Sequence, residues 1–127
     1  MKLGDDSNFL EVIEAPNAGF PGIYSVRARM SDSLSECSVR NEAIVFDSSE
    51  VTRTGFAEFA SLKTHTFILP AGRGGSITLT RDRRGAIAVS YRIPSWEADA
   101  VLEGKILVVG EFSTELLRDF KVLLEQK

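Results

Sequence analysis

Residues 75–93, GSITLTRDRRGAIAVSYRI, carry the strongest structural signal in the chain. Apolar residues alternate with polar or small ones on both sides of Asp82-Arg83-Arg84-Gly85, which is the pattern of two half-buried strands joined by a tight turn. An aspartate at the first turn position can accept hydrogen bonds from the amides that follow it, and a glycine at the fourth can adopt a positive φ. The stretch therefore predicts a β-hairpin.

Further strands are expected on both sides of this hairpin. The alternation is cleanest in residues 24–30, where it places Arg27 and Arg29 on one face and the apolar side chains on the other. Asn41 interrupts an apolar row and predicts a bulge near residues 40–42, and Gly104 predicts a distortion of a long strand. Besides the hairpin, the expected strands cover residues 8–14, 24–30, 36–46, 66–69 and 98–109.

Two helices are expected, over residues 47–63 and from Ser113 to the C-terminal end. Both starts share the pattern S-[ST]-E-aliphatic-x-R, at residues 48–53 and 113–118. Because helix starts converge on such residues, we interpret the likeness as local chemistry and not as a repeat.

These elements predict an α+β fold with a mainly antiparallel sheet of about six to seven strands and two helices packed on one face. Arg27 and Arg29 should then lie on the other face. We expect one domain over residues 1–127, with residues 1–7 as a flexible N-terminus.

Composition is that of a globular domain, with 43% hydrophobic and 26% charged residues. The first residues contain no apolar run, so we expect neither a signal peptide nor a membrane span. The single cysteine, Cys37, cannot form an intrachain disulfide, and we expect a cytoplasmic protein. The shared parity of Cys37 and Val39 predicts a packed, unreactive thiol.

Positive charge is concentrated in one part of the chain. Residues 72–92 hold five arginines against one aspartate, a local net charge of +4 within a chain whose net charge is −3. So small a basic segment does not indicate a general nucleic-acid binder. These arginines are either a solvated hairpin tip or a contact surface, and Trp96 is either a partner anchor or a plug over the sheet. The candidate partner or ligand contacts are Arg73, Arg81, Arg83, Arg84 and Trp96.

Several catalytic and metal-binding arrangements are missing from the sequence. One histidine, His65, and one cysteine cannot supply the three or four ligands of a zinc site, and no serine stands in a nucleophile elbow. The GRGG sequence at residues 72–75 lacks the Lys-Ser/Thr pair of a phosphate loop. The sequence does not exclude a catalytic pair of carboxylates, because spacing in sequence does not give separation in space. We predict no enzyme, and no catalytic, cofactor or metal site.

The hairpin and the two helices together form a recognisable layout. An aliphatic-x-aliphatic strand, a D-x-x-G turn and a second such strand run from Ile77 to Val89, after a helix containing Phe56 and Phe59 and before a strand and a terminal amphipathic helix. Over about residues 20–124 this layout resembles WapI-type immunity proteins and related small bacterial domains of unknown function. The resemblance implies an antiparallel sheet with packed helices, no catalytic residues and, for some members, neutralisation of a toxin by binding.

We therefore expect a non-catalytic, immunity-like protein that acts by protein–protein interaction. The alternative is a small-ligand or anion-binding sensory domain, in which a sheet lined by Tyr24, Tyr91 or Trp96 holds the ligand near Arg81 and Arg92. The expected partner is a protein and neither nucleic acid nor membrane. A homodimer through an edge strand or an exposed sheet face is compatible with the sequence.

Overall fold

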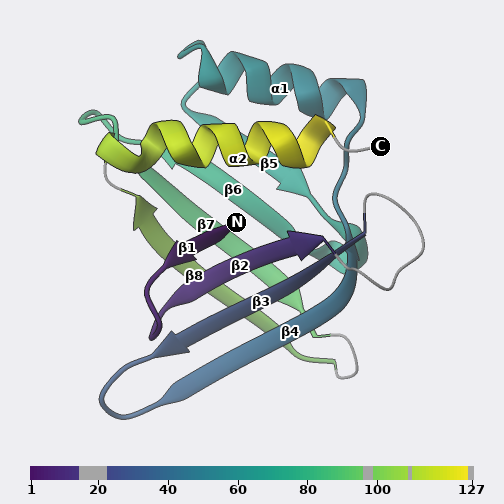
Figure 1. Ribbon diagram of the computed structural model, residues 1–127, viewed down its shortest axis with the longest axis vertical. Helices are drawn as coiled ribbons and strands as arrows, with labels where there is room; N and C mark the ends of the chain where they lie inside the picture. The colour runs from purple at the N-terminus through teal and green to yellow at the C-terminus, as the bar shows by residue number, and fades with distance from the viewer. Residues whose placement is uncertain (15–22, 96–98, 109, 126–127) are drawn as a thin grey trace.

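The computed structural model describes residues 1–14, 23–95, 99–108 and 110–125, and it is an α+β fold of two antiparallel sheets and two α-helices (Figure 1). The first sheet has the order β1-β2-β3-β4, with strands Lys2–Gly4, Phe9–Glu14, Ile23–Ser31 and Glu36–Val45. The second has the order β5-β6-β7-β8, with strands Thr66–Pro70, Ser76–Arg81, Ile87–Pro94 and Val101–Val108. The helices are α1, Glu50–Ala60, and α2, Ser113–Glu125, with short 3₁₀ turns η1, Gly72–Gly74, and η2, Gly110–Phe112.

The α+β class, the antiparallel pairing and the two helices are confirmed, but the single sheet of six to seven strands is not. The chain order is four strands and a helix, twice over. Helix α1 carries the chain from the edge of the first sheet to the edge of the second, so β4 and β5 do not become neighbours in one sheet. An isolated bridge between Phe46 and Ala71 and a 2.8 Å hydrogen bond from the Asp47 amide to the Pro70 carbonyl join the two sheets at this corner.

The N-terminal residues differ from the flexible segment that the sequence suggested. Lys2–Gly4 pair with β2 as strand β1, and the Met1 ammonium group donates a 2.9 Å hydrogen bond to the Val12 carbonyl. Leu3 is buried in the core, which fixes this short strand against the rest of the fold.

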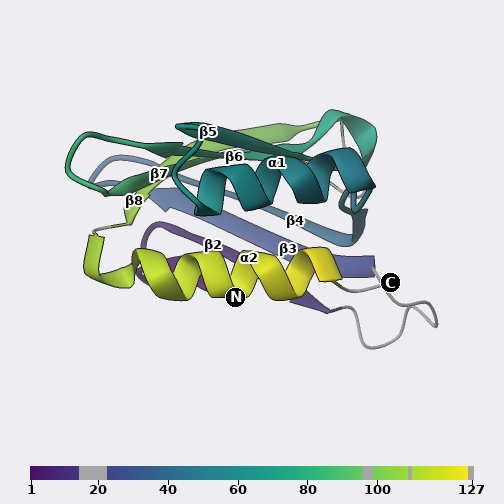
Figure 2. The same ribbon diagram turned by 90° about the horizontal axis from the view of Figure 1, so that it is seen from above.

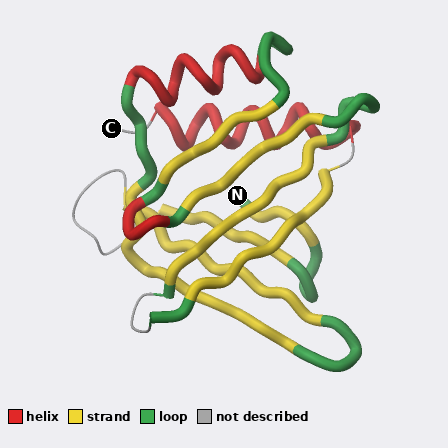
Figure 3. Tube along the Cα trace, turned by 180° about the vertical axis from the view of Figure 1, so that it is seen from behind, coloured by secondary structure: helices red, strands yellow, loops and turns green. Residues whose placement is uncertain are grey.

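The first sheet and both helices lie on the same side of the second sheet (Figures 1 and 2), and Figure 3 shows the second sheet from its uncovered side. Helix α1 packs on β5, where the Phe56 ring meets Phe67 edge-on with centroids 5.4 Å apart. Phe120 of α2 stacks on Phe56 at 6.4 Å. The core thus lies between the second sheet and a layer that consists partly of helices and partly of the first sheet.

The β6–β7 hairpin has the predicted turn chemistry. The Asp82 carboxylate accepts hydrogen bonds from the Arg84 and Ala86 amides at 2.8 and 3.0 Å, and Gly85 has a φ of 85°. Helix α1 begins later than predicted. Ser49 caps it, and the Asp47 carboxylate accepts from the Thr52 hydroxyl and the Ser49 amide, which lowers the pKa of Asp47.

Asn41 lies at the predicted bulge and connects the two sheets. The register of β3 against β4 shifts between the pairs Val26–Asn41 and Tyr24–Ile44, which leaves an extra residue in β4. Asn41 is 1% exposed, its amide nitrogen donates to the Pro94 carbonyl at the end of β7 at 3.1 Å, and its amide oxygen accepts from the Ala43 amide at 3.1 Å. The Asn41 side chain therefore provides a hydrogen-bond acceptor for a backbone amide of the bulge and links the bulge to the second sheet.

Replacing Asn41 by alanine should lower the free energy of unfolding by about 2–3 kcal/mol, because it leaves a buried carbonyl and a partly buried amide without partners. Chemical denaturation measures this loss. Asn8→Ala is the matched control, since Asn8 also accepts a backbone hydrogen bond, from Ser31, but at an exposed site. An equal decrease in the free energy of unfolding for the two variants would show that the Asn41 link between the sheets does not contribute to stability.

Gly104 does not distort β8, contrary to the sequence prediction. The register of β7 and β8 continues through the pair Tyr91–Gly104 without interruption. A Cβ at residue 104 would come within 2.3 Å of the Tyr91 hydroxyl and 2.8 Å of the Met30 sulfur. The glycine is required because the Tyr91 ring and the Met30 side chain occupy the space above it.

Gly104→Ala should therefore destabilise the protein by about 1–3 kcal/mol through overpacking. Gly72→Ala is the control, because a Cβ there meets only the Val45 carbonyl oxygen, at 4.0 Å. Thermal unfolding of both variants tests the difference, and a Gly104→Ala protein as stable as the control would contradict the packing described above.

Candidate protein-binding face

The basic residues singled out in the sequence do not form one cluster. Arg73 lies in η1 before β6, whereas Arg83 and Arg84 lie in the turn after it. The six residues of β6 separate them by roughly 20 Å along the strand. Arg83 and Arg84 are exposed at the hairpin tip, and Trp96 lies outside the described residues.

Arg81 has a structural contact of its own. Its guanidinium group lies 4.2 Å from the centre of the Phe59 ring, and its Nη1 donates a 2.9 Å hydrogen bond to the Phe59 carbonyl near the end of α1. Arg81 thereby holds the last turn of α1 against β6.

Arg81→Ala should lower the free energy of unfolding by about 1–2 kcal/mol, because it removes a charge-assisted hydrogen bond and a cation–π contact. Arg84→Ala, at the exposed end of the same hairpin, should leave stability within about 0.5 kcal/mol of wild type. Denaturant titration of both proteins decides whether Arg81 is structural, and unchanged stability of Arg81→Ala would remove this role.

Two of the residues that the alternative function places in a ligand site, Tyr24 and Tyr91, are buried, and the third, Trp96, lies outside the described residues. Tyr24 and Tyr91 are 5% and 3% exposed and belong to the core, and burial raises the pKa of Tyr91. Arg92 forms an ion pair with Glu103 on the outer side of the second sheet. These residues do not line a common open site.

A different set of basic residues lies together on the outer face of the first sheet. We call this surface the arginine face. Register places its residues in two cross-strand rows. The first row is Lys2, Glu11, Arg27 and Arg40, and the second is Gly4, Phe9, Arg29 and Ser38.

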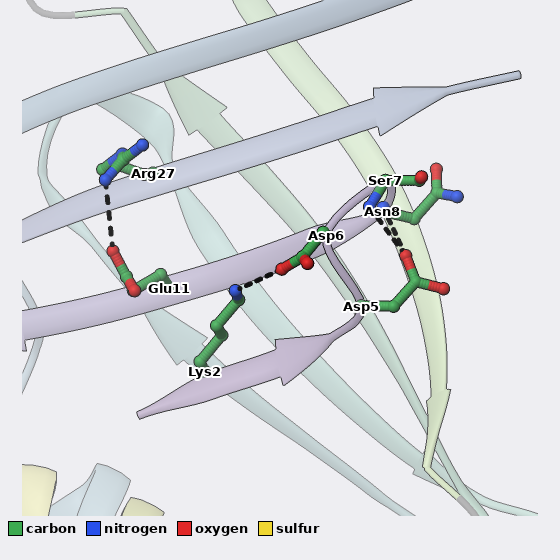
Figure 4. A network of polar contacts seen from close by, with 7 residues as sticks. All are labelled: Lys2, Asp5, Asp6, Ser7, Asn8, Glu11 and Arg27. Carbon is green, nitrogen blue, oxygen red and sulfur yellow. Dashed lines mark hydrogen bonds and ion pairs between the residues drawn. The ribbon is translucent and has the colours of Figure 1, made fainter.

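Phe9 is the aromatic centre of the arginine face. The Lys2 ammonium group and the Arg27 guanidinium group lie 5.0 and 6.0 Å from the centre of its ring. Arg27 also pairs with Glu11 at 3.6 Å, and Lys2 with Asp6 at 3.2 Å (Figure 4).

The turn that precedes Phe9 is held by Asp5. Its carboxylate accepts hydrogen bonds from the Asn8 and Ser7 amides at 2.9 and 2.8 Å (Figure 4). These bonds stabilise the charged form and lower the pKa of Asp5. The turn therefore fixes how Phe9 enters β2.

Arg29 borders a hollow in the arginine face. Its Nη2 pairs with Glu36 at 3.0 Å, while its Nε is buried and has no hydrogen-bond partner among the described residues. The hollow has a volume of about 370 Å³ and is lined mainly by Phe9, Arg27, Arg29, Glu36, Ser38 and Arg40.

The sequence placed Arg27 and Arg29 outward correctly but did not identify this surface. Period-2 alternation gave the orientation of these two side chains. Arg40 joins them only through the register of β3 with β4, next to a bulge. The signal available in the sequence was the pair of outward arginines, Arg27 and Arg29, on a regularly alternating strand.

Cys37 is exposed, which corrects the prediction of a packed thiol. Its parity is that of core residues, and it pairs with Met30 across the strands. The β3–β4 hairpin, however, projects beyond the rest of the fold (Figure 1). Cys37 lies in this projecting part of β4 and stays exposed, although Met30 opposite it packs over Gly104 of β8.

Among residues 1–14, 23–95, 99–108 and 110–125 there is no group of three or more His, Cys, Asp and Glu side chains arranged to hold a metal ion. No helix within the same residues has the length and apolar character needed to cross a membrane. Comparison with protein-family models, curated proteins and solved structures finds no match to this chain.

Proposed function

We propose that this chain is a non-catalytic bacterial binding protein that acts through a protein–protein interface on the arginine face. The observation that carries the proposal is the grouping of Arg27, Arg29 and Arg40 around Phe9 on an open sheet surface. Arginine and aromatic side chains dominate the binding energy of protein interfaces. A sheet surface with such residues offers a partner several strong contacts at once.

The ion pairs of this face are weak enough for their arginines to form new ion pairs with a partner. The Arg27–Glu11, Arg29–Glu36 and Arg40–Glu42 pairs lie at the surface with Glu11 and Arg29 partly buried, so each stabilises the free protein by about 1 kcal/mol or less. Their arginines can turn to a partner at little cost. Charges complementary to those of a partner mainly raise the association rate and select among partners.

An immunity-like role, in which the partner is a toxin that the chain neutralises by binding, is the form of this proposal that the resemblance of the sequence suggests. The second candidate function, binding of a small anion, is favoured by the buried and unpartnered Nε of Arg29 beside the hollow.

Capture of partners from a lysate of the source organism by tagged protein tests the proposal. We expect one stoichiometric partner, lost with Arg27→Glu/Arg40→Glu and retained with Arg83→Glu/Arg84→Glu. Both variants change the net charge equally, so the comparison isolates the position of the arginines from overall charge. Thermal unfolding of both establishes that they are folded.

Retention of the partner by the first variant and loss with the second would move the interface to the hairpin tip. Failure of the wild-type protein to retain any stoichiometric partner would count against a protein-binding function. Saturable stabilisation by an inorganic or metabolite anion would then support the second candidate.

A further inference from the structure

The order of charges across the first sheet breaks at one position. Register gives the row Lys2, Glu11, Arg27, Arg40, in which charge alternates until two arginines stand directly opposite each other on β3 and β4. Like charges in directly opposed positions destabilise a sheet. Glu42, which pairs with Arg40 at 3.3 Å, belongs to the same strand, so it does not lie between the two arginines in the row.

The hollow coincides with this break. Arg27 and Arg40 line it together with Arg29, whose buried Nε has no partner within the described part of the chain, and with the Ser38 hydroxyl. A buried donor without an acceptor costs free energy, which is recovered when an acceptor binds. The opposed arginines and Arg29, the residue that carries the unpartnered donor, thus line the same hollow, and both features favour an anionic acceptor there.

We infer that the hollow is a carboxylate subsite, in which an aspartate or glutamate side chain of a protein partner lies between Arg27 and Arg40. This inference rests on the proposed function and names the chemistry of the partner. The carboxylate restores the alternation of charge in the row, and the planar guanidinium groups match its two oxygens. The partner surface at this point is acidic.

The surrounding charges favour a carboxylate over a phosphate group. Glu36 lines the hollow, and Glu42 lies beside Arg40, so a doubly charged group would meet two nearby carboxylates. A carboxylate that belongs to a protein segment can also place apolar atoms against Phe9. A free anion cannot, and on so shallow a surface it gains too few contacts to offset its loss of freedom.

The test uses an acetylated tetraglutamate amide as the probe and an acetylated tetraglutamine amide as its uncharged match. The signals of the arginine Nε–H groups are followed by NMR during titration at low salt. We expect a saturable shift of the Arg29 signal with tetraglutamate and none with tetraglutamine. Binding should weaken about fivefold in Arg40→Gln and remain unchanged in Arg84→Gln.

Equal affinity of Arg40→Gln and wild type, or equal response to the two peptides, would overturn the carboxylate subsite. Glutarate that binds as tightly as tetraglutamate would overturn the assignment to a protein segment and leave a site for free dicarboxylates. Arg40→Lys, which keeps the charge, is the second variant. It should bind tetraglutamate more weakly than wild type, because it loses the planar contact with both carboxylate oxygens.

The outcomes separate this inference from the proposed function. A partner that is captured through Arg27 and Arg40 while tetraglutamate fails to bind would keep the protein-binding function and reject the carboxylate. Saturable tetraglutamate binding without any captured partner would keep the subsite and reject the function.

Discussion

The buried amide of Asn41 is the contact on which the arrangement of the two sheets depends. It satisfies the backbone inside the β4 bulge and hydrogen-bonds the end of β7, so it fixes both the register of the first sheet and its attachment to the second. The Phe46–Ala71 bridge reinforces the same corner. The arginine face inherits its geometry from this contact, because Arg40 immediately precedes Asn41 in β4. A core position and a surface site are thus set by one side chain.

Local sequence pattern predicted the elements better than their assembly. Alternation identified the β6–β7 hairpin and the outward direction of Arg27 and Arg29, and the isolated polar residue Asn41 marked the bulge. Pattern alone does not show which strands become neighbours after a helix, and therefore the split into two sheets was missed. The prediction of a packed Cys37 thiol was wrong for a related reason. Alternation along a strand gives the direction of a side chain, but it does not show whether other residues cover that side chain. The position of Arg40 directly opposite Arg27 likewise follows from the register of β3 with β4, which the sequence pattern does not give.

The arginines of the chain differ in what they contribute to the fold. A sheet surface selected for stability alone would carry an acidic residue opposite Arg27 on both sides, and it does so only on the β2 side, with Glu11. Arg81, in contrast, lies over Phe59 and fixes a helix end. Arginines that look equivalent in the sequence thus divide into one that maintains the fold and a group that remains available at the surface.

The twofold occurrence of four strands and a helix has a consequence for how the protein unfolds. Helix α1 follows the first sheet but packs on β5 of the second, and Leu116 of α2 lines a cavity together with Leu3 of β1. Each half therefore covers apolar surface that belongs to the other. Loss of structure in one half therefore exposes apolar surface of the other. We therefore expect the two halves to unfold together, despite a chain order that looks modular.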